Sequence, residues 1–334
     1  MPLEREISVV VIGRNEGPRL ARCLESVRGA EGLAECQLIY VDSASTDDSV
    51  ERARSFGADV VVLEDAPFTA ARGRNAGWRR AEAPLVLFLD GDTVLHPEFA
   101  AAAAREIERS RAAAVWGHRR ETRTADSLYN RLLDLDWIYP PGPSPFCGGD
   151  VLFRRGVLEA VDGYDEGLIA GEEPEMCRRV RALGESILHI DVPMTGHDLA
   201  MTRFSQYWRR AERAGYAYAQ VSERFKNSED PFWLSEARRN RVHAVGLGVA
   251  GLLFVGLLIV FGRPVLWLLL LPFAVLLRTA VRCRFKSPSL PLRLLYAVHS
   301  HAQQIPILYG QWTYFRGRKE GRARTLIEYK ETPS

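Results

Sequence analysis

The chain has 334 residues, of which 47% are hydrophobic and 26% are charged. This balance excludes a disordered chain and allows one large or two ordinary domains with a buried core. The net charge of +2 is too small to indicate a nucleic-acid partner, and we expect none. The five cysteines are scattered without CxxC spacing, which predicts a reducing compartment and no zinc site. Residues 1–6 lack a secretory pattern, so we expect the amino-terminal part to stay in the cytoplasm.

The first 95 residues alternate between strand and helix patterns. Short apolar runs that begin at Ile7, Leu38, Val60 and Leu85 predict four strands, and the run at Leu85 is expected to be buried on both faces. Three helices are predicted between them: one opened by Pro18, one started by the Ser45 and Asp48 capping pair and ended by Gly57, and one from about Thr69 to Ala81. Such alternation predicts a mostly parallel sheet with helices on both faces.

Polar loops follow three of these strands, at residues 13–16, 42–48 and 90–92. In an open α/β sheet the carboxyl ends of the strands form the ligand-binding edge, where helix amino termini favour phosphate. Asp90 and Asp92 flank Gly91 and supply hard oxygen ligands for a cation such as Mg²⁺, which also takes phosphate oxygens. The alternative is an ordinary turn, because Asp and Gly are favoured turn residues. No GxGxxG motif follows the first strand and no GxxxxGK[ST] motif occurs anywhere, which argues against a dinucleotide dehydrogenase and a P-loop enzyme.

Five segments, at residues 8–16, 41–49, 71–77, 87–92 and 163–179, follow one another in the order found in a known family. With them the chain resembles the family 2 glycosyltransferases over roughly residues 7–200. The resemblance implies a GT-A fold, which is an α/β domain with a Rossmann-like mixed sheet. It also implies a hexosyl-type transferase that takes its sugar from a UDP- or GDP-linked donor.

The resemblance assigns roles to individual residues. It implies that Asp42 and Glu16 hold the base and ribose, and that Arg74 and Asn75 lie near the nucleotide. Three residues are implied as ligands of Mg²⁺ or Mn²⁺: Asp92 first, with Asp90 shared between ribose and metal, and His197 completing the shell. The alternative for His197 is a structural histidine, and His189, inside a strand pattern, is expected in the core.

Sugar transfer also requires a base, and a second pair of acidic residues, Glu172 and Glu173, is the candidate. Negative charge grows on the departing diphosphate, where a divalent cation stabilises it, while the acceptor hydroxyl must lose a proton to a base. Glu172 and Glu173 stand where the family has a Glu-Asp pair, which implies Glu173 as the base and Glu172 as its neighbour. A helix amino cap at Glu173 is the alternative, because Pro174 suits a first helical turn.

The chain departs from the family pattern near its first loop. Where the family usually has Pro-Thr-Tyr-Asn, this chain has Ile-Gly-Arg-Asn at residues 12–15. The aromatic contact to the base is therefore missing, and Arg14, next to Asn15, is expected to stack or to reach phosphate. Glu173, where the family has Asp, is longer by one methylene group. The donor base and sugar stay open.

The carboxyl-terminal third predicts a membrane hairpin. Residues 242–261 are apolar or glycine apart from His243, which matches a membrane-spanning helix. Residues 264–277 form a second apolar run, which spans only if it continues past Arg278. Arginines flank the pair on both outer sides, so the positive-inside rule places both flanks in the cytoplasm, at the inner membrane. The predicted organisation is a catalytic domain at 1–200, an amphipathic interfacial region at 201–241, a transmembrane hairpin at 242–286, and an interfacial helix, broken near Pro306, with a basic tail at 287–334.

The expected function is a metal-dependent inverting glycosyltransferase that acts on a hydroxyl of a lipid-linked or cell-envelope glycan. A polyprenyl-phosphate glycosyltransferase is the first alternative, although its ionised acceptor needs no base. A non-catalytic membrane scaffold that binds a nucleotide sugar is the second. Residues 206–210 loosely resemble the QxxRW segment of processive synthases, but processive synthesis would need more spanning helices than this sequence has. The oligomeric state stays open.

Overall fold

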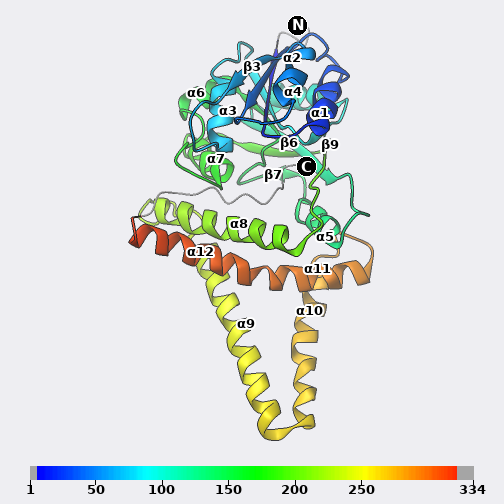
Figure 1. Cartoon of the computed structure of the whole chain (residues 1–334), viewed down its shortest axis with the longest axis vertical. Helices are drawn as coiled ribbons and strands as arrows, with labels where there is room; N and C mark the ends of the chain where they lie inside the picture. The colour runs from blue at the N-terminus through cyan, green and yellow to red at the C-terminus, as the bar shows by residue number, and fades with distance from the viewer. Residues whose placement is uncertain (1–5, 322–334) are drawn as a thin grey trace.

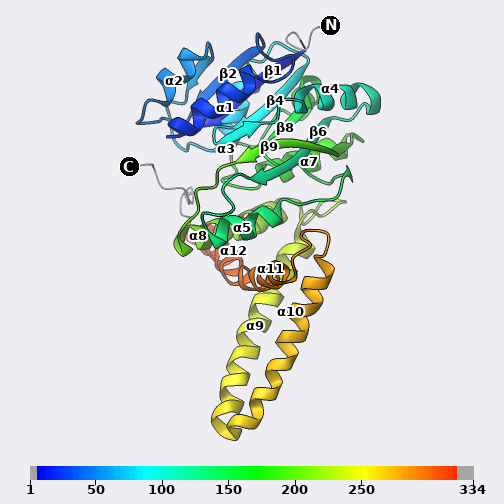
Figure 2. The same cartoon turned by 90° about the vertical axis from the view of Figure 1, so that its right-hand side faces the viewer.

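The structure is a computed structural model that describes residues 6–321. It has three parts, which follow one another along the long axis of the molecule (Figure 1). An α/β domain stands at one end, a group of helices lies across its base, and a two-helix hairpin projects away from these helices. The view turned by 90° shows the same arrangement (Figure 2).

The α/β domain contains one mixed sheet with the strand order β3-β2-β1-β4-β8-β6-β9-β5, and β7 pairs with β9. Its strands are β1 (Ile7–Gly13), β2 (Gln37–Asp42), β3 (Asp59–Val62), β4 (Leu85–Asp90), β5 (Thr93–Leu95), β6 (Ala114–Glu121), β7 (Gly142–Pro143), β8 (Val151–Arg154) and β9 (Ile187–His197). Its helices are α1 (Pro18–Arg28), α2 (Ser49–Ser55), α3 (Ala70–Trp78), α4 (Phe99–Ser110), α5 (Leu128–Asp136), α6 (Arg155–Ala160) and α7 (Glu172–Ala182).

Strands β3, β2, β1 and β4 are mutually parallel, as the alternation of strands and helices predicts. The inner three are largely buried, whereas β3 at the edge is partly exposed. The predicted start of α2 at Ser45 is wrong, because the helix begins at Ser49 with Asp48 at its cap position. Ser45 instead donates its backbone N–H and its hydroxyl to Asp42, at 2.7 and 2.6 Å. A side chain that bonds to nearby backbone in this way stabilises a turn in place of a helix.

The second half of the sheet brings distant segments together at the ligand-binding edge. β6 and β9 are parallel, and Glu121 at the end of β6 is the register partner of His197 at the end of β9. On its other side β9 pairs with β5, where His197 faces Thr93. Asp92, one residue before Thr93, therefore lies next to His197 although the two are 105 positions apart in the chain.

Three helices form the base on which the α/β domain stands, and we call them the platform: α8 (Phe204–Phe225), α11 (Leu290–Ala302) and α12 (Gln304–Lys319). Helices α8 and α12 lie side by side in both views (Figures 1 and 2). Their backbones touch where each has a glycine. A Cβ atom on Gly215 would lie 2.0 Å from the carbonyl oxygen of Ile307, and one on Gly310 would lie 2.0 Å from that of Glu212.

The hairpin consists of α9 (Leu234–Phe261), the 3₁₀ helix η2 (Arg263–Leu269) and α10 (Leu270–Arg282). Both arms are long and apolar enough to cross a membrane, by length and composition only. In their most apolar windows only 6% and 11% of the residues are buried by other parts of the protein. The arms are therefore not core helices. The predicted span at 242–261 falls inside α9, which begins eight residues earlier, at the platform.

We predict that Gly310→Ala lowers the stability of the platform, because the added methyl group would overlap the backbone of α8 and force the two helices apart. Overpacking of this kind costs about 1–3 kcal/mol. Gly317→Ala in the same helix is the matched control, because nothing lies within 4 Å of a Cβ atom there. The check is the midpoint of thermal unfolding in detergent, which should fall for Gly310→Ala and stay equal or rise for Gly317→Ala. Equal midpoints for both variants would contradict the close packing.

Candidate functional site

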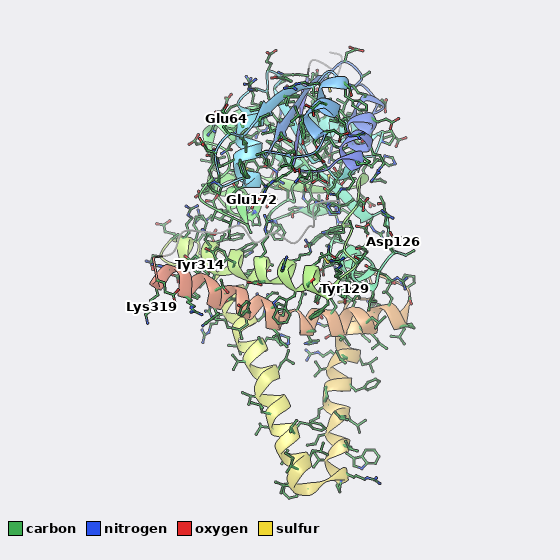
Figure 3. The ribbon with its side chains drawn as sticks, viewed as in Figure 1. Glu64, Asp126, Tyr129, Glu172, Tyr314 and Lys319 are labelled. Carbon is green, nitrogen blue, oxygen red and sulfur yellow. The ribbon has the colours of Figure 1, made fainter. Side chains whose placement is uncertain are left out.

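A cavity of about 670 Å³ opens between the α/β domain and α8. Its walls come from the loops after β1 and β4, the amino terminus of α7, the end of β9, and one side of α8. Glu172, at the start of α7, lies on the side of the α/β domain that faces α8 (Figure 3). The volume lies in the range of small-molecule sites, which is about 300–1,000 Å³.

Arg74 in α3 is the centre of the cavity wall, and its side chain is only 3% exposed. One terminal nitrogen donates to Asp90 at 2.9 Å, and the other lies 3.1 Å from both Glu172 and Glu173. Burial lowers the pKa of Arg74, but the three carboxylates more than offset this and hold the pKa well above its ordinary value. The positive charge of Arg74 therefore holds three acids at the cavity and is largely neutralised by them.

Glu173 lies in an environment that suits a catalytic base. Burial and the neighbouring charge of Glu172 raise the pKa of Glu173 to about 7, although Arg74 lowers it. Its side chain is still 19% exposed, toward the cavity that it lines. A carboxyl group with a pKa near neutral pH is suited to proton transfer. The alternative role as an amino cap is wrong, because Gly171 occupies the cap position of α7 and no side chain caps the helix.

Asp92 and His197 form a second centre at the cavity. Nε2 of His197 lies 3.3 Å from a carboxylate oxygen of Asp92, and both residues are at most 4% exposed. Behind the ring, Nδ1 lies 3.7 Å from Oε2 of Glu121. This distance is too long for a hydrogen bond, so Glu121 contributes a negative charge behind the ring.

Asp92 and His197 fit a cation that takes most of its ligands from a bound phosphate group and from water. In the part of the chain that the structure describes, no group of three or more His, Cys, Asp or Glu side chains is arranged to hold a metal ion. Asp92 and His197 would supply one oxygen and one nitrogen, and phosphate oxygens and water would supply the rest, as is usual for Mg²⁺. The imidazole also suits a transition metal such as Mn²⁺. Asp90, the third predicted ligand, is bound to Arg74.

The predicted nucleotide residues of the first loop lie at one end of the cavity. Arg14, Asn15 and Glu16 all line it. The guanidinium of Arg14 stacks over Phe68, 5.3 Å from the ring centre, so an aromatic ring is present although the sequence lacks the family's tyrosine. The side-chain oxygen of Asn15 accepts the backbone N–H of Thr46 at 2.7 Å, which ties the first loop to the second.

Asp42 and Asn75 lie away from the cavity wall. Asp42 is fully buried and accepts hydrogen bonds from Tyr40 and Ser45, while its neighbour Ser43 lines the cavity. Asn75 is bonded to the loop before α7, where its amide group donates to the carbonyl oxygen of Tyr164 at 2.8 Å and accepts the N–H of the same residue at 2.9 Å. These hydrogen bonds give Asn75 a structural role in holding the loop at Tyr164. Its role in nucleotide binding stays a prediction.

Sequence reasoning missed two charged residues that fix the turn at Asp90. Asp150 accepts the backbone N–H of Asp90 at 3.0 Å and the hydroxyl of Thr195 at 2.7 Å. Arg119 in β6 lies 3.4 Å from the carboxylate of Asp90 and 3.7 Å from that of Asp150. The available signal was the run of charged residues at the end of β6, where an apolar strand turns polar at the sheet edge.

The platform closes the cavity from below, and a buried polar group joins it to α5. Asp136 at the end of α5 accepts a hydrogen bond from Tyr296 at 2.8 Å and lies 3.2 Å from Nε2 of His299. His299 is bonded in turn to the hydroxyl of Tyr207 in α8, at 2.9 Å. The next residue, Trp137, packs its ring 5.0 Å from that of His197 and 4.9 Å from the guanidinium of Arg119. The platform is thus connected to the Asp92 and His197 pair through the end of α5.

Comparisons with known proteins identify the family of the chain. The profile described as "Glycosyl transferase family 2" matches residues 8–159, and that of "Glycosyl transferase family group 2" matches residues 85–298. The relatives include glycosyltransferase AglE of Haloferax volcanii, which is 24% identical over 54% of this chain and 63% of its own length. They also include an N-acetylglucosaminyltransferase of Mesorhizobium japonicum, which is 26% identical over 50% of this chain and 43% of its own. The matches thus span less than two thirds of the length of these relatives.

Solved structures share the fold. The mannosyltransferase PcManGT from Pyrobaculum calidifontis, determined in complex with GDP-Man and Mn²⁺, has a TM-score of 0.63 at 18% identity and covers 93% of this chain and 87% of its own. Residues 1–349 of S. aureus TarS give a TM-score of 0.51 at 17% identity over 95% of this chain and 92% of theirs. Because one of the two family profiles covers more than half of the sequence, the chain belongs to the family 2 glycosyltransferases, and its α/β domain has their GT-A fold.

Proposed function

We propose that the chain is a membrane-anchored, metal-dependent inverting glycosyltransferase that transfers a sugar from a UDP- or GDP-linked donor to a hydroxyl of a lipid-linked or cell-envelope glycan. One observation carries this proposal: a single cavity is lined by the Asp92–His197 pair and by Glu173, whose pKa is raised to about 7. The structural relative that binds GDP-Man and Mn²⁺ supports a nucleotide sugar and a divalent cation.

Each residue has a task in the proposed reaction. Asp92 and His197 would hold the cation, which would stabilise negative charge on the leaving diphosphate. Glu173 takes the proton from the acceptor hydroxyl as that oxygen attacks the anomeric carbon. Arg74 keeps Glu173 and Asp90 in place, and Arg14 and Glu16 border the nucleotide end. In the proposed inverting reaction the acceptor oxygen attacks opposite the leaving diphosphate, as expected when one carboxyl group serves as the base.

The membrane orientation is part of the same proposal. The hairpin of α9, η2 and α10 would cross the membrane, with the α/β domain on the side where nucleotide sugars are made, the cytoplasm. Arginines at both outer ends of the hairpin, such as Arg239 and Arg282, support this orientation by the positive-inside rule. Both arms expose nearly all of their apolar side chains, which would then contact lipid. The platform would lie at the membrane surface.

We predict that Glu173→Gln lowers the turnover number at least about 100-fold, because a neutral amide cannot accept the acceptor's proton. Donor binding should change little, since Glu173 does not belong to the nucleotide end. The exposed acid Glu159, changed to Gln, is the control and should keep full activity. The measurement is release of nucleoside diphosphate by the purified full chain with lipid extract as the acceptor source. Full activity of Glu173→Gln would favour a phosphate acceptor, as in the polyprenyl-phosphate enzymes.

The pKa of Glu173 sets a pH dependence. Because its folded-state pKa is raised to about 7, the protonated, inactive form accumulates as the pH falls through that value. We expect kcat/KM to fall about tenfold per pH unit below pH 7 and to level off above it. A profile measured from about pH 5.5 to 8.5 checks this, with Glu173→Gln as the reference, whose residual rate should lose this limb. An unchanged limb in Glu173→Gln would assign the titration to another group.

The metal assignment is tested by binding. Asp92→Asn should weaken Mn²⁺ affinity about tenfold or more in the presence of UDP or GDP, because it removes one of two protein ligands. The control is Asp126→Asn, which removes an exposed carboxylate outside the cavity. Calorimetric titration of Mn²⁺ into the full chain in detergent reads affinity independently of turnover. Equal affinities for the two variants would refute Asp92 as a ligand.

A further inference from the structure

One wall of the cavity comes from the platform and has no task in the mechanism above. It is the side of α8 that faces the α/β domain, with seven residues at the cavity: Tyr207, Arg210, Ala211, Arg213, Ala214, Ala217 and Tyr218. Their spacing of three or four residues places them on one face of a helix. The cavity is therefore lined both by the first loop of the α/β domain and by α8 of the platform. The hairpin projects from the platform, away from the α/β domain (Figure 2).

Two arginines supply the charge of this wall. Arg210 and Arg213 are half-buried and stand one turn apart, whereas their neighbour Arg209 is exposed and lies outside the cavity. Arg210 lines the cavity together with Asp136 of the neighbouring helix α5. Burial raises the pKa of Asp136, but hydrogen bonds from His299 and Tyr296, with a smaller contribution from the charge of Arg210, bring it below its ordinary value.

The small residues between the arginines leave space for a ligand. Ala211, Ala214 and Ala217 present only methyl groups, and aromatic rings from Tyr218 and Trp233 border the same wall. Paired guanidinium groups beside an apolar surface suit a phosphate on an apolar carrier, because Arg binds phosphate oxygens through paired N–H donors. The donor diphosphate belongs to the other end, near Asp92 and His197, so this wall faces the second substrate.

We propose that Arg210 and Arg213 bind the phosphate or diphosphate of a lipid-linked acceptor, whose lipid leaves the cavity along the platform. This inference rests on the proposed function, and it names the acceptor class as a phosphorylated lipid carrier. The acceptor's phosphate would stay on α8 while its sugar hydroxyl reaches Glu173. The two arginines thus select the acceptor and take no part in proton transfer.

The test measures lipid retention by the full chain in nanodiscs of phosphatidylcholine doped with a polyprenyl diphosphate or with the uncharged polyprenol. Lipid that co-purifies after transfer to detergent is quantified by mass spectrometry. We expect wild-type protein to retain the polyprenyl diphosphate at least fivefold over the polyprenol. Arg210→Gln and Arg213→Gln should each lose most of this preference, while Arg209→Gln, on the same helix, should keep it. Equal retention of both lipids by the wild type, or full retention by both cavity variants, would overturn the proposal.

Competition separates the possible sources of the phosphate. Added inorganic diphosphate should displace the polyprenyl diphosphate only weakly if the lipid carrier is the ligand. Displacement at equal concentration would overturn the lipid assignment and indicate a soluble phosphorylated acceptor. Failure of the proposed function is read separately, in the same nanodiscs, from Mn²⁺-dependent binding of UDP and GDP. Protein that binds neither nucleotide but retains the lipid would contradict the transferase mechanism and leave the α8 site standing.

Discussion

The arrangement of the catalytic wall depends on one buried cation, Arg74. Its guanidinium joins Asp90, from the turn after β4, to Glu172 and Glu173 at the start of α7. Three carboxylates so close together would repel one another strongly in a poorly solvated site, and a single arginine between them removes that conflict. The same arginine limits how far the pKa of Glu173 rises. Arg74 therefore tunes the candidate base and positions the turn that leads to Asp92.

The register of the sheet brings the Asp92 and His197 pair together. β9 pairs with β5 on one side and β6 on the other, so that Thr93, His197 and Glu121 meet across three strands. Trp137 covers this centre, and its neighbour Asp136 is bonded to Tyr296 and His299 of α11. The platform is thus joined to the candidate site through partly buried hydrogen bonds at Asp136 and through a buried hydrogen bond between His299 and Tyr207. The buried bond loses the most free energy when broken, because its partner is left without water.

Local patterns in the sequence predicted the first four strands, the turn at Asp90 and the two apolar arms, because each depends on a short run of residues. The meeting of Asp92, His197 and Glu121 depends on strand order, which no local run encodes. For the same reason Asp150 and Arg119 went unpredicted, since each acts on a turn far away in the sequence. Asn75 shows the reverse case: its motif is clear in the sequence, but its hydrogen bonds go to the loop at Tyr164 and not to the cavity wall.

The glycines at the crossing of α8 and α12 have a consequence for distance. Because the two backbones touch at Gly215 and Gly310, α8, which forms one wall of the cavity, is closely packed on α12. A helix is roughly 10 Å across with its side chains, so the reacting centre would stand at a fixed height of about one or two such diameters above the headgroups. The platform would then fix the distance between Glu173 and the membrane surface. Only an acceptor whose carrier spans that distance would reach Glu173.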